Sequence, residues 1–369
     1  MTRFLALLSL AVLTSCTPRA ELIFRPDLAA DIETRTIFIA STRQVENGRL
    51  GRGRSPDTTF LTFDMTVPPA RQPGTIPSFR RDVRPDEQFI VGNHATLAGA
   101  AGFRAALAAE LAESPAGRRE AIIYVHGFNN TFDEGVLRLA QLADDFGFEG
   151  SAIHYSWPSA GQVFGYVYDR DSVLFARDGL DNLITDIKRA GADTIILVAH
   201  SVGSHLVMET LRQRDIAHPG SVARDLAGVM LISPDIDVSL FRSQAKRIEK
   251  LPDPFGIFVS DRDRALRLSA RLTGQKDRLG SASAQEVADL NVTLVDVTEF
   301  SEGTGHFTTA ESPALISMFN NAGNLEAAFQ GDSAGRAGLL PGTILTVQEA
   351  TEIILSPAEL LLSPDGAFE

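Results

Sequence analysis

A serine, an aspartate and a histidine occur in this chain at places where catalytic side chains are expected. Each follows a run of apolar and β-branched residues that predicts a buried strand: Thr194–Val198, Pro254–Ser260 and Val292–Val297. Because functional groups gather at the carboxyl ends of parallel strands, the three side chains are expected at one edge of a sheet. A serine hydroxyl becomes a strong nucleophile when a base removes its proton and an acid orients that base. We therefore predict nucleophilic catalysis by Ser201, His306 and Asp263.

The sequence around Ser201 has the pattern of a nucleophile elbow. Residues 199–203 read Ala-His-Ser-Val-Gly and follow the strand-like run. Beyond them, apolar residues recur at helical spacing: Leu206, Val207, Met208 and Leu211. A strand, a sharp turn with small residues on both sides of the serine, and a helix are the context that an elbow requires. Ala199 stands where glycine is usual. The alternative is a tight turn with an incidental serine.

Three aspartates are candidates for the acid. Asp263 lies just before the helical stretch 265–272, where it is suited to orient a histidine or only to cap the helix. Asp261 is two positions earlier in the same loop, and Asp235 follows the preceding strand, 226–233. We favour Asp263 and keep Asp261 and Asp235 as alternatives.

His306 is the histidine best placed to act as the base. It ends a Gly-Thr-Gly-His loop after the last core strand, where glycines let an imidazole reach across the sheet edge. His200 flanks the serine with its side chain directed away, His205 lies on the elbow helix, and His126 belongs to a different motif. The remaining histidines have no suitable context: His94, His154 and His218.

The tetrahedral intermediate of acyl transfer needs backbone amides that stabilise its oxyanion. We expect one amide from Val202, directly after the nucleophile at a helix N-terminus. The second is expected from Phe128, because a His-Gly pair (126–127) precedes it and glycine lets the loop turn an amide inward. Asn129 and Asn130 either hold this loop by hydrogen bonds or cap the next helix.

Strand-like and helical runs alternate along most of the chain. The expected core strands are 36–40, 59–67, 121–125, 151–155, 194–198, 226–233, 254–260 and 292–297. Helices are expected at 95–113, 132–146 and 172–190. The alternation predicts an α/β protein with a mostly parallel, doubly wound sheet flanked by helices. The order serine, acid, histidine fits the α/β-hydrolase fold.

The connections between these elements bear on the substrate. Few residues separate Asp235 from Pro254, where many lipases insert a lid. We therefore expect no large lid, an open site and modest substrates rather than bulk triacylglycerol. A glycine-rich turn or loop is expected at 47–56 and an aromatic loop at 161–168. Four aromatic residues near the second loop either line an acyl pocket or pack in the core: Trp157, Phe164, Tyr166 and Tyr168.

Several motifs, in this order, resemble a bacterial α/β-hydrolase family of unassigned function. They are Val-His-Gly-Phe-Asn-Asn (125–130), Tyr-Ser-Trp-Pro-Ser (155–159), Tyr168-Asp169 with Ser172, Ala-His-Ser-Val-Gly (199–203), Ser-Asp-Arg-Asp-Arg-Ala-Leu (260–266) and Gly-His (305–306). The resemblance covers roughly residues 36–319. It implies the hydrolase fold and a serine triad, but no particular substrate. Val202 stands where the family usually has methionine, which leaves a backbone donor unaffected.

The N-terminus has the features of a lipoprotein leader. Arg3 precedes an apolar run, 4–13, that is too short to span a membrane. Leu-Thr-Ser-Cys (13–16) resembles the lipobox, which is cut before a cysteine that becomes lipidated, and Cys16 is the only cysteine in the chain. Thr17 rather than aspartate follows, which resembles the outer-membrane sorting pattern. We expect a lipid-anchored protein of the cell envelope, at the outer membrane and facing the periplasm; the alternative is ordinary secretion.

Four segments are expected along the chain. They are a signal peptide (1–15), a tether (16–35), a hydrolase domain (36–320) and a C-terminal extension (321–369) in which 343–347 and 351–355 are suited to a small hairpin.

The composition and motifs define the expected chemistry. The net charge of −13 disfavours nucleic acid as a partner. The sequence has no metal-ligand cluster, phosphate-binding loop or dinucleotide fingerprint, so we expect no metal and no cofactor. We predict a carboxylesterase-like serine hydrolase of small acyl esters, held at the membrane by its lipid anchor. The alternatives are amide hydrolysis or acyl transfer by the same triad, and a non-catalytic binding or scaffold protein of the envelope.

Overall fold

The computed structural model describes residues 19–77, 82–274, 277–301, 305–321, 344–347 and 350–355. The leader and Cys16, on which the predicted lipid anchor depends, lie outside these residues, as do Gly303 and Thr304 of the predicted histidine loop. Among the described helices, none has both the length and the apolar character needed to cross a membrane.

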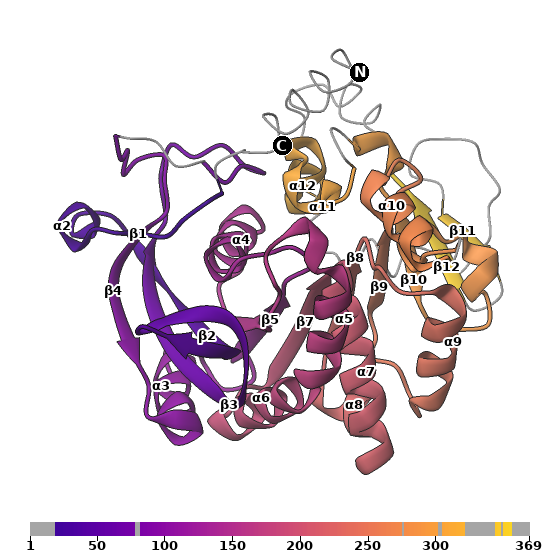
Figure 1. Ribbon diagram of the computed structural model, residues 1–369, viewed down its shortest axis with the longest axis horizontal. Coiled ribbons are helices and arrows are strands. Elements are labelled where there is room, and N and C mark those ends of the chain that lie inside the picture. Colours follow the sequence, from indigo (N-terminus) through magenta and orange to yellow (C-terminus); the bar gives the residue numbers. More distant parts are fainter. Residues whose placement is uncertain are drawn as a thin grey trace, which may run out of the picture.

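The described strands form one sheet (Figure 1). They are β1 (Ile23–Phe24), β2 (Thr34–Glu46), β3 (Arg49–Thr66), β4 (Ile90–Thr96), β5 (Glu120–Val125), β6 (Ser151–Ser156), β7 (Thr194–His200), β8 (Gly228–Ile232), β9 (Phe255–Val259), β10 (Thr293–Asp296), β11 (Ile344–Val347) and β12 (Ala350–Ile354). Their order across the sheet is β1-β4-β3-β2-β6-β5-β7-β8-β9-β10-β12-β11. In this order, the run of strands β2-β6-β5-β7-β8-β9-β10-β12 is parallel throughout. β3 is antiparallel to β2 and β4, and β11 is antiparallel to β12.

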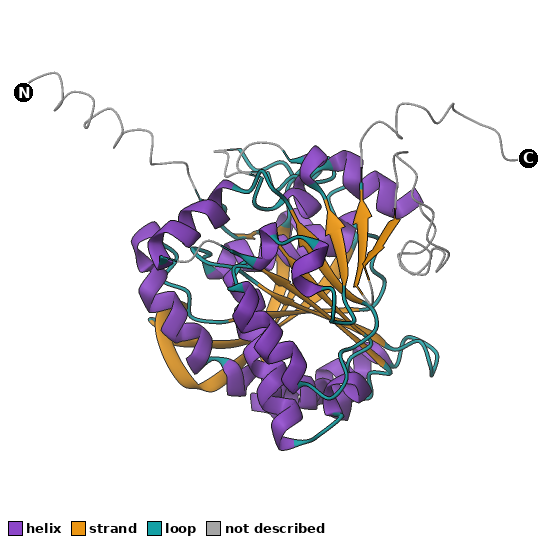
Figure 2. Ribbon diagram, turned by 90° about the vertical axis from the view of Figure 1, so that its right-hand side faces the viewer, coloured by secondary structure: helices purple, strands orange, loops and turns teal. Residues whose placement is uncertain are grey.

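Helices cover both faces of this sheet (Figure 2). They are α2 (Pro26–Ala29), α3 (Gly99–Leu111), α4 (Phe132–Asp145), α5 (Tyr166–Phe175), α6 (Arg177–Ala190), α7 (Val202–Ala217), α8 (Ser221–Asp225), α9 (Val238–Arg247), α10 (Arg264–Thr273), α11 (Thr308–Glu311) and α12 (Pro313–Asn321). Side chains of α3, α6, α7, α8 and α9 share one buried apolar cluster, and those of α4, α11 and α12 share the other. On β5, Ile123 and Val125 belong to the first cluster and Tyr124 to the second, as the alternation of a strand requires.

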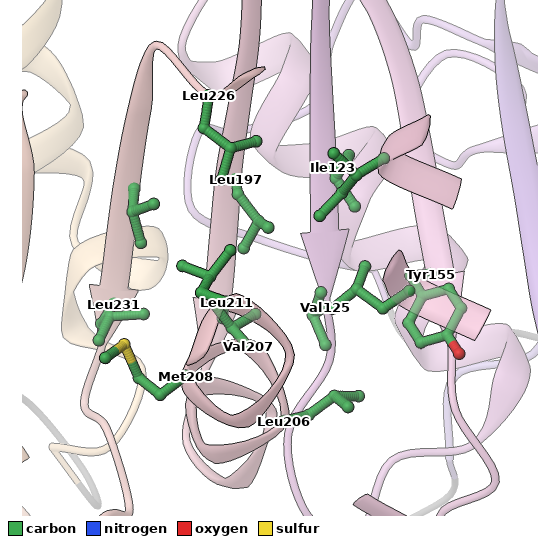
Figure 3. Close-up of a cluster of buried hydrophobic side chains, with 14 of the residues drawn as sticks. Ile123, Val125, Tyr155, Leu197, Leu206, Val207, Met208, Leu211, Leu226 and Leu231 are labelled. Atoms are coloured by element: carbon green, nitrogen blue, oxygen red, sulfur yellow. The ribbon is translucent and has the colours of Figure 1, made fainter. Parts of the chain in front are cut away.

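The start of α7 is fixed by its burial. Figure 3 shows Leu206, Val207 and Leu211 of this helix beside Val125 of β5 and Leu197 of β7. All five side chains are fully buried. Burying a side chain of this size contributes about 1.5–3 kcal/mol relative to leaving it in water. Burial of these apolar side chains therefore holds the N-terminus of α7, and the turn before it, against the ends of β5 and β7.

The glycine-rich stretch 47–56, expected as a turn or loop, is a turn only at its first two residues, and the rest of it is strand. Only Asn47 and Gly48 turn, with φ of 51° and 77°, and β3 begins at the next residue. A two-residue Asn-Gly turn with positive φ matches the twist of a hairpin. The later glycines lie within β3. Glycine is needed at position 51 because a Cβ there would meet the Glu46 carboxylate at 2.6 Å. They leave room for side chains from the opposite strand.

Other elements also differ from the expected ones. β4 is a strand that the sequence does not predict, and it takes up 95–96, so α3 begins only at Gly99. Residues 163–168, where a loop was expected, are helical: they form a 3₁₀ turn (Val163–Gly165) and the first residues of α5. The expected helix 172–190 is divided at Ala176 into the end of α5 and all of α6. In these places tertiary contacts override weak local signals.

The two ends of the described chain join the main sheet. The segment expected as a tether contains β1, which pairs with β4, and the short helix α2. β11 and β12 form an antiparallel pair at the places expected for a hairpin, and β12 also pairs with β10 in parallel. The domain boundaries drawn from the sequence stay predictions.

Candidate active site

Ser201 occupies a strained turn between β7 and α7. Its backbone has φ of 52° and ψ of −124°, a left-handed conformation that is unusual for a residue with a side chain. Gly203 explains the tight turn, because a Cβ there would lie 2.4 Å from the carbonyl oxygen of His126. The helix therefore begins directly against the end of β5. This is the arrangement that the sequence predicts for a nucleophile elbow.

Asp263 and His306 are brought together from distant parts of the chain. Oδ2 of Asp263 is 2.7 Å from Nδ1 of His306. Asp263 is fully buried, and its other oxygen accepts a hydrogen bond from the amide of Leu266 at 2.9 Å, which caps α10. Both roles weighed for this aspartate, orienting a histidine and capping a helix, thus occur in the same side chain. Gly305 has a φ of 68°, which bends the backbone directly before His306.

His306 contacts His200, the residue directly before Ser201. The two imidazole rings are 4.7 Å apart, and Nε2 of His200 is 3.2 Å from the carbonyl oxygen of His306. Burial holds the pKa of His200 well below its usual range, so this imidazole is neutral. Among the described residues, no hydrogen bond joins Ser201 Oγ to His306. Catalytic hydrogen bonds are often long or misaligned without substrate, so the roles of Ser201 and His306 stay predictions.

The two alternative acids have other surroundings. Both oxygens of Asp235 are 2.7 Å from Oγ of Ser269, Oδ2 also accepts from the hydroxyl of Tyr166 at 3.1 Å, and Oδ1 is 3.3 Å from Nε of Arg278. Asp261 is exposed to solvent. Of the three aspartates, only Asp263 contacts an imidazole among the described residues.

The loop expected to supply an oxyanion donor packs directly on the elbow. A Cβ at Gly127 would lie 2.9 Å from Cβ of Ser201, so glycine allows this close approach. The amide of Gly127 itself donates to Oδ1 of Asn130 at 3.1 Å. Among the described residues, the amides of Phe128 and Val202 donate to no protein acceptor. They are the two predicted oxyanion donors, and both are free to bind an oxygen of a ligand.

The asparagines that follow hold the loop instead of capping α4. The helix cap is Thr131, whose hydroxyl accepts from the amide of Glu134 in a capping box. Asn130 binds the loop backbone, and Asn129 adopts φ of 59°. Asparagine tolerates this left-handed conformation better than most residues. One of the two roles weighed for these residues is therefore observed.

Residues 100–322, more than half of the chain, match the family described as alpha/beta hydrolase of unknown function (DUF900). The chain belongs to this family. The predicted α/β-hydrolase fold is thereby confirmed, with the long and mostly parallel sheet flanked by helices. By family and fold the chain is therefore classed with the α/β hydrolases.

Other similar proteins add less. The uncharacterized protein alr1448 of Nostoc sp. (strain PCC 7120) is 40% identical over 62 residues, and the match covers 16% of each chain. A hydrolase described as YdeN-like from Pectobacterium atrosepticum is 19% identical, with a TM-score of 0.26 over 58% of this chain and 98% of its own. EstE1, a thermostable carboxylesterase from a metagenomic library, is 14% identical, with a TM-score of 0.32 over 82% and 91%. At these TM-scores neither structure supports an argument about activity.

Two buried charged residues, Arg43 and Asp169, contact the loop that carries Phe128. Arg43 donates to the carbonyl oxygens of Asn130 at 3.1 Å and Ser159 at 3.0 Å, and burial lowers the pKa of this arginine to about 10. Asp169 accepts from the hydroxyl of Ser159 at 2.6 Å and from the amide of Asn129 at 3.4 Å. Burial raises the pKa of Asp169. Together they fix the backbone on both sides of the loop that carries Phe128. Asp169 belongs to a quoted motif, whereas Arg43 has no sequence signal.

The aromatic residues near this site do not form one pocket. Trp157 is fully buried, stacks on His126 at 4.8 Å, and donates to the His126 carbonyl oxygen at 2.7 Å. Phe164 is 98% exposed, and Tyr168 packs under Arg54. Only Tyr166 lines a cavity next to Val202. Trp157 is therefore a core residue, and of the four aromatic residues only Tyr166 remains a candidate for an acyl pocket.

The first described residues contact the loop that carries Phe128. Arg19 donates to the carbonyl oxygen of Asn129 at 2.9 Å and to its side-chain oxygen at 2.6 Å, and it pairs with Glu134 at 2.8 Å. The amide of Leu22 donates to Asp133 at 3.0 Å. This contact was not expected from the sequence, because a tether with little periodicity gives no sign of where it docks.

Proposed function

We propose that this protein is a serine hydrolase of acyl esters, in which Ser201, His306 and Asp263 form the catalytic triad. The observation that carries the proposal is the 2.7 Å contact between Asp263 and His306 at the same sheet edge as the strained Ser201 turn. A buried carboxylate at Nδ1 leaves Nε2 of His306 as the atom that exchanges protons with a nucleophile.

The proposed reaction proceeds through an acyl-enzyme. Ser201 Oγ attacks the acyl carbon while its proton passes to Nε2 of His306. The oxyanion of the tetrahedral intermediate accepts hydrogen bonds from the amides of Phe128 and Val202. The C–O bond to the leaving alkoxide breaks, and the imidazolium protonates that oxygen. Water then attacks the acyl-enzyme by the same route, and the acid product leaves.

Hydrolysis of short p-nitrophenyl esters and of the matched p-nitroanilides tests this proposal. We expect turnover of the esters by the wild-type protein and loss of turnover in Ser201→Ala. Ser204→Ala is the matched control, because its hydroxyl donates to the carbonyl oxygen of Ala199 and has no proposed role. Preferred turnover of the anilides would assign an amidase instead, and acyl transfer to an added alcohol would assign a transferase. A folded protein without any turnover would favour the non-catalytic alternative.

We also propose that the protein is lipid-anchored at Cys16 in the cell envelope, at the outer membrane and facing the periplasm. The lipobox-like Leu-Thr-Ser-Cys supports the anchor. Multiple acyl chains give stable membrane attachment without a transmembrane helix. In a bacterial host, we expect incorporation of a palmitate analogue and recovery with outer membranes, both lost in Cys16→Ser. Equal recovery of Cys16→Ser with membranes would overturn the anchor.

A further inference from the structure

A cavity of about 370 Å³ opens beside the N-terminus of α7. Val202 lines it, and Tyr166 separates it from the oxyanion loop through an edge-to-face contact with Phe128 at 5.3 Å. Small-molecule sites in proteins begin at about this volume. Val202, one of the two predicted oxyanion donors, lines the cavity and directly follows Ser201 in the chain, so one molecule is able to occupy the cavity and reach Ser201.

The acceptors in this cavity are already used by the protein. The carboxylate of Asp235 binds Ser269, Tyr166 and Arg278. Asp237 also lines the cavity, but its Oδ1 accepts from the amide of Leu240 at 3.0 Å as the N-cap of α9. The two carboxylates therefore have little capacity left for a ligand's donors.

The donors in the cavity are not used in the same way. Arg170 lines it, is exposed, and has no hydrogen bond or ion pair with another described residue. Arg278 is 6% exposed, and its Nε lies at ion-pair distance from Asp235 without the alignment of a hydrogen bond. Nη2 of Arg278 binds Thr273, whereas Nη1 has no partner among the described residues. His205 is 8% exposed, lines the same cavity, and likewise has no hydrogen-bond partner there.

The position of Arg278 is set by the backbone. Arg278 forms a bridge with Asp237, the amide of Leu279 donates to Ile236 at 2.9 Å, and the amide of Val238 donates to Asp277 at 3.3 Å. Arg278 therefore has a fixed place in the lining of the cavity. In a chain with net charge −13, two arginines directed at one cavity without a full set of acidic partners favour an anionic ligand.

We propose that this cavity is a binding subsite for a carboxylate carried by the ester substrate, recognised by Arg170 and Arg278. The inference rests on the proposed function, and it names the substrate class of that site. The carboxylate belongs to the acyl part or to the alcohol part of the ester, and the two cases differ in which substrate is preferred.

Two matched pairs of esters test the subsite. Monomethyl succinate and methyl butyrate differ by a carboxylate in the acyl part, and acetoxyacetate and ethyl acetate differ by one in the alcohol part. We expect the anionic member of one pair to have a kcat/KM about tenfold or more above its neutral partner, as a charge-assisted hydrogen bond allows. The pair that responds identifies the side of the ester carbonyl that occupies the cavity.

Substitution of Arg170 completes the test. We expect Arg170→Gln to lower the preference at least about threefold and Arg170→Glu to abolish it, since both remove a charge-assisted donor. Arg189→Gln is the matched control, because Arg189 is an exposed arginine at the other end of the sheet, in the last turn of α6. Equal kcat/KM values within both pairs, or a preference that Arg170→Gln leaves intact, would overturn the subsite while leaving ester hydrolysis standing.

A binding measurement separates failure of the subsite from failure of the proposed function. In Ser201→Ala, calorimetric titration with monomethyl succinate and with acetoxyacetate reports carboxylate binding without turnover. If no ester is hydrolysed, the proposed function fails, and this titration still decides the subsite. Tighter binding of an anionic ester than of its neutral partner, weakened by Arg170→Glu, supports the subsite. Equal binding overturns it.

Discussion

Asp263 holds His306 through a 2.7 Å contact between Oδ2 and Nδ1, and it does so from a fully buried position. The same carboxylate caps α10 through Oδ1. The geometry of the histidine is therefore tied to the start of a helix, which makes the acid both a catalytic and a structural element of the proposed site.

Substitution of the acid separates these two roles. Asparagine is a good helix cap but carries no charge, so Asp263→Asn is expected to keep the melting temperature near that of the wild type. We expect its kcat on a p-nitrophenyl ester to fall by roughly 10³–10⁴-fold, because the imidazolium loses its partner and the tautomer changes. Asp263→Ala should in addition lose about 1 kcal/mol of stability with the cap. Asp261→Asn is the control. If Asp261→Asn lost as much kcat as Asp263→Asn, Asp263 would not be established as the catalytic acid.

Asp169 is expected to act through the position of the Phe128 amide. Asp169→Asn weakens the contacts to Ser159 and Asn129, so we predict a fall in kcat of about 10- to 100-fold with a much smaller change in KM. Asp171→Asn removes the same charge from an exposed position on the same helix and should leave both constants unchanged. A rise in KM alone in Asp169→Asn would mean that this aspartate shapes substrate binding and has no effect on the oxyanion loop.

Gly203 is expected to be indispensable for the elbow. A Cβ would meet the His126 carbonyl oxygen at 2.4 Å and the Val125 carbonyl oxygen at 2.8 Å, and backbone atoms cannot easily move away. We predict that Gly203→Ala costs about 1–3 kcal/mol of stability, as overpacking does, and abolishes ester turnover. Gly102→Ala in α3 is the control, because its Cβ has ordinary space at 3.4 Å and alanine favours helices. Denaturant unfolding and ester turnover are measured for both variants. Wild-type stability and turnover in Gly203→Ala would contradict the prediction.

The buried histidines predict the pH dependence of stability. Burial lowers the pKa of His154 to about 3 and holds the pKa of His126 and His200 well below the usual range. In the unfolded chain each titrates near 6.5, so below this pH the unfolded state binds more protons than the folded state. The free energy of unfolding should therefore fall with decreasing pH, by about 1.4 kcal/mol per pH unit for each histidine.

Urea unfolding between pH 7.5 and pH 5 measures this slope. His154→Gln should reduce it by the share of one histidine, and His218→Gln, at an exposed position, should leave it unchanged. Stability that stays constant or increases as the pH falls from about 6.5 to 5 would contradict the buried, neutral state of these imidazoles.

The parallel core and its strand ends could be predicted from sequence because the signals there are strong. The apolar run before Ser201, the helical spacing after it and Gly203 all agree on an elbow, and burial of the resulting faces enforces it. The order of serine, aspartate and histidine along the chain follows the order of the strands. Local pattern and tertiary packing point the same way in this half of the chain.

The misjudged elements lie where local signals were ambiguous. Gly51 and Gly53 look like loop residues, yet they occur in β3 because the side chains of Glu46 and Gln44 lie across them. Arg43 has no periodic neighbour or motif that marks it, since its role depends on carbonyl oxygens from two distant loops. The docking of Arg19 on Asn129 is likewise a long-range contact that no local pattern encodes.

The most direct test of the account is covalent labelling with a fluorophosphonate, followed by peptide mapping of the adduct. The account predicts a single adduct on the peptide that contains Ser201, no labelling in Ser201→Ala, and slower labelling in Asp263→Asn and in His306→Gln. A folded wild-type protein that is not labelled, or an adduct that maps to another serine and persists in Ser201→Ala, would contradict it.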